Sequence, residues 1–194
     1  LRRAQGPDGG ISASRYSYMG GFDGTSNVLA GQLFGVPEKG TMAHAFVQSF
    51  TSLNDIENLM LKGADGKDNN FVSMVLEIRY AHGFHQTNEG ELAAFIAYAQ
   101  AFPNGFLALV DTYNTLESGV PNFVCVATAL SLLGYKPIGV RIDSGDLAKL
   151  SKQIRQLLQT GGQKYGVDLF KQTIVASNSI NEKILRSLNE QGHE

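Results

Sequence analysis

The chain has 194 residues, 43% of them hydrophobic, and a formal net charge of −2. That length suits one domain or most of a larger one. Because the charge is nearly balanced and no basic run occurs, the sequence gives no reason to expect a nucleic-acid partner. No apolar run approaches the roughly 20 residues of a membrane span. The single cysteine, Cys125, lies in an apolar stretch, which favours a reducing compartment over a disulfide scaffold.

The two ends of the sequence indicate an internal segment of a longer protein. The chain starts at Leu1 rather than at a methionine, and its last residues follow a helical pattern without anything that would close a domain. We expect such a segment to be inactive by itself and to fold poorly alone, because it would expose strand edges and apolar helix faces. A complete small domain is the alternative.

The first half of the chain has an irregular pattern. Residues 22–26 and 40–44 each look like a strand end that feeds a helix, and helical turns are expected at Asn27–Phe34 and Ala45–Phe50. The glycine pairs at 9–10 and 20–21 predict turns. Strand and helix units therefore begin early, but less regularly than in the second half.

A polar stretch interrupts the middle of the chain. Asn, Asp, Gly and Lys dominate residues 63–70, which predicts a solvated turn region, and Phe71–Tyr80 has the pattern of a helix. We expect residues from about 53 to 88 to form a variable excursion from the main fold.

The second half repeats one structural unit. Short apolar runs at 106–110, 138–142 and 173–176 each end in polar residues and are followed by a helical pattern. Alternating strands and helices at this spacing predict βα units and a parallel sheet. Doubly wound sheets and (β/α) barrels both fit the pattern, and in both folds ligands bind at the carboxyl ends of the strands.

Those strand ends bring four polar side chains to one predicted edge of the sheet, namely Asp111, Arg141, Asp143 and Asn178. Arg141 and Asp143 are two positions apart, so they share a face of their strand. Charges at such an edge must either pair internally or meet a ligand, because an unpaired charge is costly to desolvate. The arrangement suits an anionic, phosphate-bearing substrate.

A purely structural interpretation of the same residues stays open. Arg141 and Asp143 could form a salt bridge, while Ser144 and Asp146 cap the helix that follows. Asp111 could likewise cap the turn after its strand.

The histidines allow two interpretations as well. His44 lies where a strand-like stretch enters an apolar helix, and a lone histidine there is more often a satisfied core residue. The spacing of His82 and His85 could ligate a metal, although no carboxylate or cysteine cluster supports such a site. The sequence contains neither a dinucleotide-binding fingerprint nor a P-loop.

Seven motifs together resemble those of nicotinate phosphoribosyltransferases, especially the animal type, and they occur in family order. They are 1-LRRAQGPDGG-10, 16-YSYMGGFDGTSNVLAG-31, 40-GTMAHAF-46, 109-LVDTYNT-115, 121-PNF-123, 138-IGVRIDSGDL-147 and 175-VASNSINE-182. The resemblance implies an α/β fold of the type II phosphoribosyltransferase kind. Residues 1–194 would be one partial catalytic domain, the central part of an irregular (β/α) barrel with parallel strands alternating with helices.

The resemblance also implies a reaction. Nicotinate and phosphoribosyl pyrophosphate would give nicotinate mononucleotide and pyrophosphate, coupled to ATP hydrolysis and dependent on Mg²⁺ or Mn²⁺, as the first step of NAD synthesis from nicotinate. Such a ligase and glycosyltransferase would be a cytoplasmic homodimer without nucleic-acid or membrane partners. The alternatives are another (β/α)-barrel phosphosugar enzyme, such as quinolinate or nicotinamide phosphoribosyltransferase, or a non-catalytic paralogue that serves as an assembly subunit.

Roles for individual residues follow from the same resemblance. His44 matches the histidine that the family phosphorylates from ATP. Asp111 and Asp143 would stabilise positive charge on the ribose or hold the Mg²⁺, directly or through water.

Other residues are implied in substrate binding. Arg141, Thr41 and Ser26 match positions at the nicotinate end of the site. Ser26 stands where the nicotinamide enzyme has an aspartate, and a carboxylate there would repel nicotinate. Arg2 and Asn178 match polar positions that bind phosphoribosyl pyrophosphate.

Overall fold

The computed structural model describes residues 4–194, which divide into two compact units. The first unit ends at Thr41, and the second comprises Met42–Glu194. Arg2 lies outside the described residues, so its implied role stays a prediction.

The first unit is built on a pair of helices, α1 (Gly6–Met19) and α2 (Val28–Phe34). Asn27 caps α2, since its Oδ1 accepts a hydrogen bond from the amide of Ala30 at 3.3 Å. The turn predicted at Gly9–Gly10 is wrong because α1 runs through both glycines. A proline and Asp8 in the first turn favour that helix start, and they outweigh the cost of the glycines.

The strand ends predicted at 22–26 and 40–44 are wrong as well. In the described part of the first unit, extended pairing is limited to an isolated parallel bridge between Thr25 and Glu38. Gly24 lies against the carbonyl of Pro37, where a β-carbon would come within 2.5 Å of the oxygen. Residues 24–25 instead contact residues 37–39 through their backbone, since the Thr25 amide donates to the Pro37 carbonyl and the Lys39 amide donates to the Thr25 carbonyl, each at 2.9 Å.

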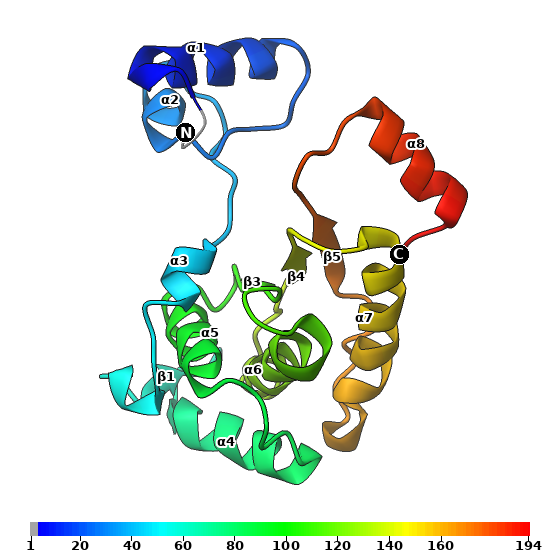
Figure 1. Cartoon of the computed structure of the whole chain (residues 1–194). Helices are drawn as coiled ribbons and strands as arrows, with labels where there is room; N and C mark the ends of the chain where they lie inside the picture. The colour runs from blue at the N-terminus through cyan, green and yellow to red at the C-terminus, as the bar shows by residue number, and fades with distance from the viewer. Residues whose placement is uncertain (1–3) are drawn as a thin grey trace. The chain divides into compact units, whose positions relative to one another are not determined.

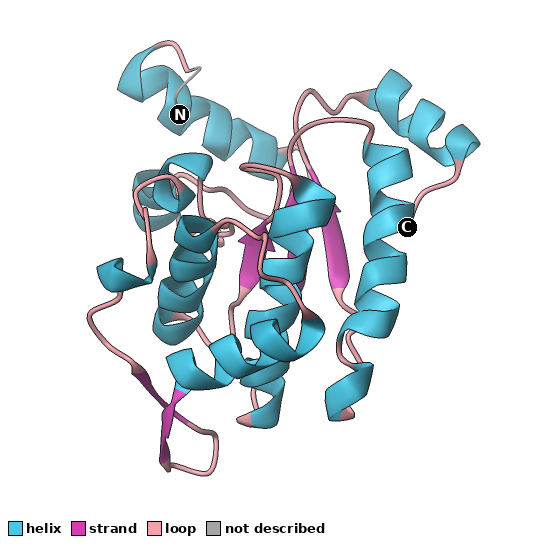
Figure 2. Cartoon of the chain, turned by 60° about the horizontal axis from the view of Figure 1, so that its bottom comes forward, coloured by secondary structure: helices cyan, strands magenta, loops and turns pink. Residues whose placement is uncertain are grey.

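The second unit contains the predicted parallel sheet (Figures 1 and 2). Its strands are β3 (Leu107–Leu109), β4 (Gly139–Ile142) and β5 (Thr173–Ala176), in the order β3-β4-β5. Both pairs are parallel, with Leu109 opposite Arg141 and Arg141 opposite Val175. The expected α/β fold of parallel strands alternating with helices is therefore confirmed, while closure into a barrel stays a prediction.

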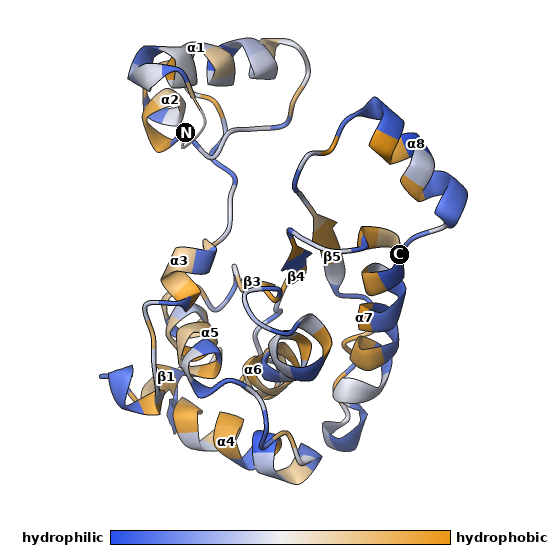
Figure 3. Cartoon of the chain, in the orientation of Figure 1, coloured by the Kyte–Doolittle hydropathy of each residue, from blue (hydrophilic) through white to orange (hydrophobic). Residues whose placement is uncertain are grey.

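Helices pack around this sheet, and α6 lies at their centre. The helices are α3 (His44–Val47), α4 (Phe71–His82), α5 (Glu89–Ala101), α6 (Val120–Leu132), α7 (Leu147–Gly161) and α8 (Glu182–Gln191). Every residue of α6 from Val120 to Leu130 is buried, and α6 contacts α4, α5 and α7. A helix that is apolar on all sides is expected in such an interior position. By contrast, α7 carries distinct hydrophobic and hydrophilic faces (Figure 3).

Short elements connect the helices. They are a 3₁₀ turn at Leu53–Asp55, an antiparallel hairpin of β1 (Met60–Lys62) and β2 (Asp68–Asn70), a π-helix at Thr115–Gly119 and a 3₁₀ turn at Gln163–Tyr165. The polar run at 63–70 forms the exposed turn and second strand of the hairpin. The predicted helix that follows is present as α4, and it belongs to the core, where Phe71, Val75 and Ile78 are buried.

None of the described helices is long and apolar enough to cross a membrane.

Candidate active site

Four of the predicted site residues lie together in the second unit, and we call them the polar rim: His44, Asp111, Arg141 and Asp143. His44 starts α3, Asp111 follows β3, and the other two stand at the end of β4. His44 Nε2 lies 3.6 Å from Asp143 Oδ2 and 4.0 Å from Asp111 Oδ1. Arg141 Nη2 donates to Asp143 Oδ1 at 3.3 Å. The parallel register of β3 and β4 places Asp111, Arg141 and Asp143 at one end of the sheet, and His44 reaches them from α3.

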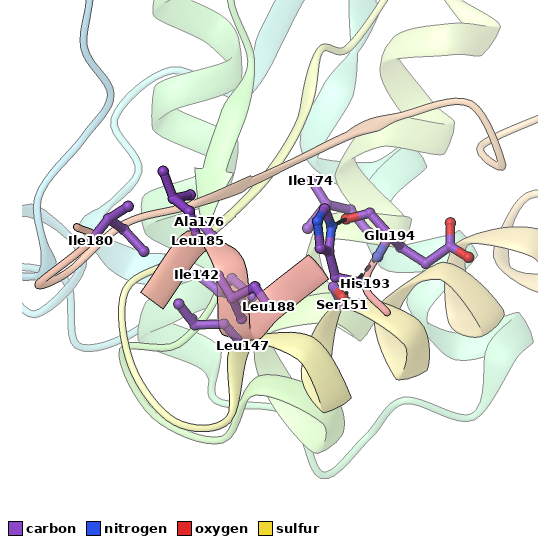
Figure 4. A pocket seen from close by; sticks show the side chains of 10 residues that line it. All are labelled: Ile142, Leu147, Ser151, Ile174, Ala176, Ile180, Leu185, Leu188, His193 and Glu194. Carbon is purple, nitrogen blue, oxygen red and sulfur yellow. Dashed lines mark hydrogen bonds between the residues drawn. The ribbon is translucent and has the colours of Figure 1, made fainter. Parts of the chain in front are cut away.

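Strand β4 separates the rim from an apolar cavity. Ile142, between Arg141 and Asp143 in sequence, lines a cavity of about 180 Å³ together with side chains such as Ile174 and Leu185 (Figure 4). Successive side chains of a strand point to opposite faces. The alternation along β4 thus directs the charged pair to one face and the apolar residue to the other.

Asp111 is held by groups on the neighbouring strand. Its Oδ2 accepts hydrogen bonds from the Asp143 amide at 2.7 Å and from Ser144 Oγ at 2.6 Å. Its other oxygen, Oδ1, is buried and has no hydrogen-bond partner in the described part of the chain. The possibility that Ser144 caps the next helix is wrong, because the N-cap of α7 is Asp146 and the Ser144 hydroxyl instead donates to Asp111. Asp146 alone caps α7, accepting from the amide of Lys149 at 3.0 Å.

Asp143 is stabilised as a carboxylate. Burial works in the opposite direction, but a hydrogen bond from Ser177 Oγ at 2.6 Å and the charge of Arg141 hold its pKa below the usual value. The Ser177 oxygen also accepts from Arg141 Nε at 2.9 Å. Ser177 thus orients both members of the ion pair, a role that the sequence analysis missed. Its position immediately after the third strand was the available signal.

Thr112 is a second contributor that the sequence analysis missed. Its Oγ1 lies 3.1 Å from His44 Nδ1, so the two ring nitrogens of His44 have different neighbours. A hydroxyl lies at Nδ1, and two carboxylates face Nε2. The His44 side chain is 38% exposed, which leaves the ring open to a ligand.

Asn178 follows Ser177 but takes part in a separate turn. Its side-chain oxygen accepts from Ser179 Oγ at 3.2 Å, and the residue is exposed. Asn178 and Ser179 have φ values of 82° and 54°, a region that residues other than glycine rarely adopt. The predicted contact of Asn178 with phosphoribosyl pyrophosphate stays a prediction.

Two further predicted residues belong to the first unit. Ser26 is exposed and lines a polar cavity of about 340 Å³ with Ser14, Ser17 and Asn27. Thr41 is half-buried and ends the unit. Their implied contacts with nicotinate stay predictions.

The side chains of His82 and His85 each pack against an aromatic ring. His82 stacks on Phe84 with ring centroids 5.1 Å apart, and His85 packs edge-on against Tyr80. Burial, with a smaller effect of Lys164, lowers the pKa of His82. Among the residues that the structure describes, no group of three His, Cys, Asp or Glu side chains could hold a metal ion.

Comparison with known proteins connects this geometry to one group of enzymes. No protein-family model matches the chain. Over its full length, however, it is 53% identical to a nicotinate phosphoribosyltransferase of Dictyostelium discoideum and 47% identical to that of Homo sapiens. The chain resembles nicotinate phosphoribosyltransferases from end to end. The resemblance predicted from the seven motifs is therefore confirmed.

A solved structure supports the same conclusion. The crystal structure of human nicotinic acid phosphoribosyltransferase matches 97% of this chain with a TM-score of 0.87 and 46% sequence identity. The match covers 39% of the human chain, and the chain spans 33% and 38% of the Dictyostelium and human relatives. The chain therefore spans between about a third and two fifths of the length of the relatives that it matches.

Proposed function

We propose that the protein to which this chain belongs is a nicotinate phosphoribosyltransferase. It joins nicotinate and phosphoribosyl pyrophosphate to give nicotinate mononucleotide and pyrophosphate, and it hydrolyses ATP in the process. The observation that carries the proposal is the polar rim, in a chain that is about half identical to relatives bearing this name. Because these relatives are named nicotinate phosphoribosyltransferases, they favour this function over that of a nicotinamide or quinolinate phosphoribosyltransferase.

The two aspartates of the rim suit the chemistry of the sugar. When the bond from C1 to pyrophosphate breaks, positive charge develops on the ribose, as in glycoside hydrolysis. Fixed carboxylates next to that charge stabilise the transition state. Asp143 is kept ionised by Ser177 and Arg141, and Asp111 is fixed by two hydrogen bonds from the neighbouring strand.

The surroundings of His44 favour one ring nitrogen as the nucleophile. Two carboxylates near Nε2 favour the neutral tautomer with its proton on that atom, which leaves the lone pair on Nδ1. Attack of Nδ1 on the γ-phosphorus of ATP forms the N–P bond, and ADP leaves as the bridging P–O bond breaks. In this tautomer the Thr112 hydroxyl donates to Nδ1, so its hydrogen bond orients the ring in the resting site and opens when Nδ1 attacks the phosphorus.

The oxygen donors of the rim also fit a magnesium ion. Asp111 Oδ1 is buried and has no hydrogen-bond partner among the described residues, and Asp143 Oδ2 lies near the same imidazole. Mg²⁺ is commonly bound by one or two carboxylates, several waters and the phosphates of the substrate. Asp111 and Asp143 would hold Mg²⁺ or Mn²⁺, directly or through water. The bound ion would neutralise charge on the pyrophosphate.

Substrate contacts complete the proposal. The Arg141 guanidinium, anchored by Ser177 and Asp143, carries the permanent charge and planar donor geometry that suit the nicotinate carboxylate. Thr41 and Ser26 would add hydroxyl donors at the nicotinate end, while Arg2 and Asn178 would bind phosphoribosyl pyrophosphate. We also propose a homodimer and a cytoplasmic location, the latter supported by the free, buried thiol of Cys125.

The decisive experiment uses the full-length protein with γ-labelled ATP. We expect an acid-labile label on Nδ1 of His44, and pyrophosphate release with nicotinate but not with nicotinamide. A preference for nicotinamide, or product formation that is independent of His44, would contradict the proposal. An absence of both label and product would favour a non-catalytic paralogue.

A substitution at Ser26 tests substrate selection. Ser26→Asp places a negative charge near the nicotinate carboxylate, so nicotinate KM should rise by about tenfold or more while kcat changes little. Ser26→Ala, which removes the hydroxyl without adding charge, is the control and should have a smaller effect. Equal kinetics in Ser26→Asp and wild type would remove Ser26 from the site.

A further inference from the structure

A largely buried polar cluster lies where the loop that follows β3 ends in the π-helix. We call it the Glu91 cluster, comprising Asn88, Glu91, Ser118 and Asn122. Glu91, on α5, is fully buried. Its Oε2 accepts hydrogen bonds from Ser118 Oγ at 2.5 Å and from Asn122 Nδ2 at 3.0 Å. The carboxyl group therefore links α5 to the π-helix and to the start of α6.

Asn88 strengthens the same connection from the N-cap of α5. Its amide donates to Ser118 Oγ at 2.9 Å, and its carbonyl accepts from Asn122 Nδ2 at 3.0 Å. Its side-chain oxygen accepts from the amide of Glu91 at 2.8 Å. The Ser118 hydroxyl thus both donates and accepts, so its position is fixed from two directions.

The donors around Glu91 are all neutral, which suits an uncharged acid. Glu91 Oε1 and Asn122 Oδ1 are both buried acceptors without a hydrogen-bond partner in the described part of the chain. Burial raises the pKa of Glu91 to about 7, and the nearby charge of Asp111 adds to this effect. A proton on Glu91 removes the cost of an ionised carboxylate in this interior.

The cluster fixes one end of the segment that carries part of the polar rim. At the other end, the Val110 amide donates to the carbonyl of Arg141 at 3.0 Å. Gly119 lies so close to Val110 that a β-carbon would come within 1.9 Å of its carbonyl oxygen. Asp111 and Thr112, which contact Ser144 and His44, lie between these two anchors. Moving Ser118 would release the segment on one side.

We propose that Glu91 is a positioning residue which, through Ser118 and Asn122, holds Asp111 and Thr112 in the geometry that His44 requires. The proposal rests on the proposed function only in treating the rim as catalytic. The placement of the His44 ring can be measured independently of turnover. A π-helix next to a site is a common way to adjust side-chain geometry at the expense of regular hydrogen bonding.

The experiment compares three cluster variants of the full-length protein with one matched control. Ser118→Ala breaks the link, Glu91→Ala removes the carboxyl, and Glu91→Gln keeps the shape and hydrogen bonds without a charge. The control is Ser131→Ala, which removes a hydroxyl that bonds only within α6, to the carbonyl of Ala127. Readouts are kcat and KM, and the ¹⁵N chemical shifts of the His44 ring.

We expect Ser118→Ala and Glu91→Ala to lower kcat by about tenfold or more, with a smaller change in KM. Both should also shift the His44 ring signals. Glu91→Gln and Ser131→Ala should stay close to wild type in both readouts. If Glu91→Ala fails to fold, Ser118→Ala decides the question.

Two results would overturn the proposal. One is folded Ser118→Ala protein with unchanged His44 signals, and the other is a shift of equal size in Ser131→Ala. A loss in Glu91→Gln as large as in Glu91→Ala would contradict the expectation that an uncharged side chain with the same hydrogen bonds can replace Glu91. If His44 signals shift as expected but His44→Asn leaves turnover intact, the positioning role stands and the proposed function fails.

Discussion

The polar rim and the Glu91 cluster are connected by residues 110–119. Both contain a carboxyl group that is hydrogen-bonded to a serine hydroxyl, but the pKa of the carboxyl group is lowered in the rim and raised in the cluster. In each, a hydroxyl bonds closely to a carboxyl group, Ser177 to Asp143 at 2.6 Å and Ser118 to Glu91 at 2.5 Å. Arg141 stands beside Asp143, and the pKa of that carboxyl falls. Among the described residues the donors to Glu91 are the neutral Ser118 and Asn122, and burial raises the pKa of Glu91 to about 7. Burial separates the two acids: Glu91 is fully buried, whereas the Asp143 side chain is 29% exposed and gains both the Ser177 hydrogen bond and the charge of Arg141.

Solvent access separates the two regions further. The side chains of His44, Arg141 and Asp143 are 38%, 26% and 29% exposed, so a ligand can reach them. Glu91 is completely buried and can act only through its neighbours. We therefore expect changes in the rim to affect chemistry, and changes in the cluster to affect both stability and the placement of the rim.

The largest expected effect is that of His44→Ala in the full-length protein. Removing the proposed nucleophile should abolish the acid-labile label from ATP and lower the ATP-coupled kcat by about 100-fold or more. The melting temperature should change little, because the ring is partly exposed. Steady-state kinetics and thermal unfolding would be measured together. A large loss of stability with normal kcat would contradict the expectation that changes in the rim affect chemistry rather than stability.

A pH-dependent stability is expected from the Glu91 cluster. The folded-state pKa of about 7 lies above the ordinary value of 4.5, so the folded protein retains a proton that the unfolded chain releases. This contribution is fully present below pH 4.5 and is lost as pH rises through 7, by up to about 3 kcal/mol.

Urea unfolding of wild type and Glu91→Gln at pH 5 and pH 8 measures this effect. Glutamine cannot ionise, so the difference between the two proteins should change by about 2 to 3 kcal/mol between these pH values. The subtraction cancels groups that titrate equally in both proteins. A constant difference would show that Glu91 is ionised in the fold, as Asp143 is.

The intermediate effect concerns Arg141→Lys. A lysine keeps the charge but cannot reproduce both the Ser177 and the Asp143 contacts of the guanidinium, so kcat/KM for nicotinate should fall by roughly 10- to 30-fold. Arg186→Lys on α8 is the matched control, since that arginine pairs with Glu182 on an exposed surface. Comparable losses in both variants would mean that the geometry at Arg141 is unimportant.

The sequence predicted those parts of the site that belong to a repeating pattern. The three apolar runs defined the sheet, and their polar ends located Asp111, Arg141 and Asp143. Thr112 and Ser177 were not predicted, because a single hydroxyl has no periodic signature and its role depends on contacts across strands. The likeness to known motifs, rather than spacing, distinguished His44 from a core histidine.

The Glu91 cluster could not be predicted for a related reason. Glu91 occupies the first turn of a helix, where an acidic residue is usually a solvated partner of the helix dipole. Only the packing of α5 against α6 buries it. Helix α1 was missed because its internal glycines suggest a turn. In both cases the tertiary surroundings overrode a sound local rule.

The smallest effect on kcat is expected for substitutions of Asp146, which lies next to the rim in sequence but outside it. This residue belongs to the same motif as Asp143, yet its side chain caps α7 by accepting from the amide of Lys149. Asp146→Ala should therefore cost about 1 kcal/mol of unfolding free energy, while Asp146→Asn, which preserves the cap, should cost much less. Both variants should keep wild-type kcat, because the cap points along α7 rather than toward His44. A tenfold loss of kcat in the asparagine variant would extend the rim to Asp146 and require its charge in catalysis.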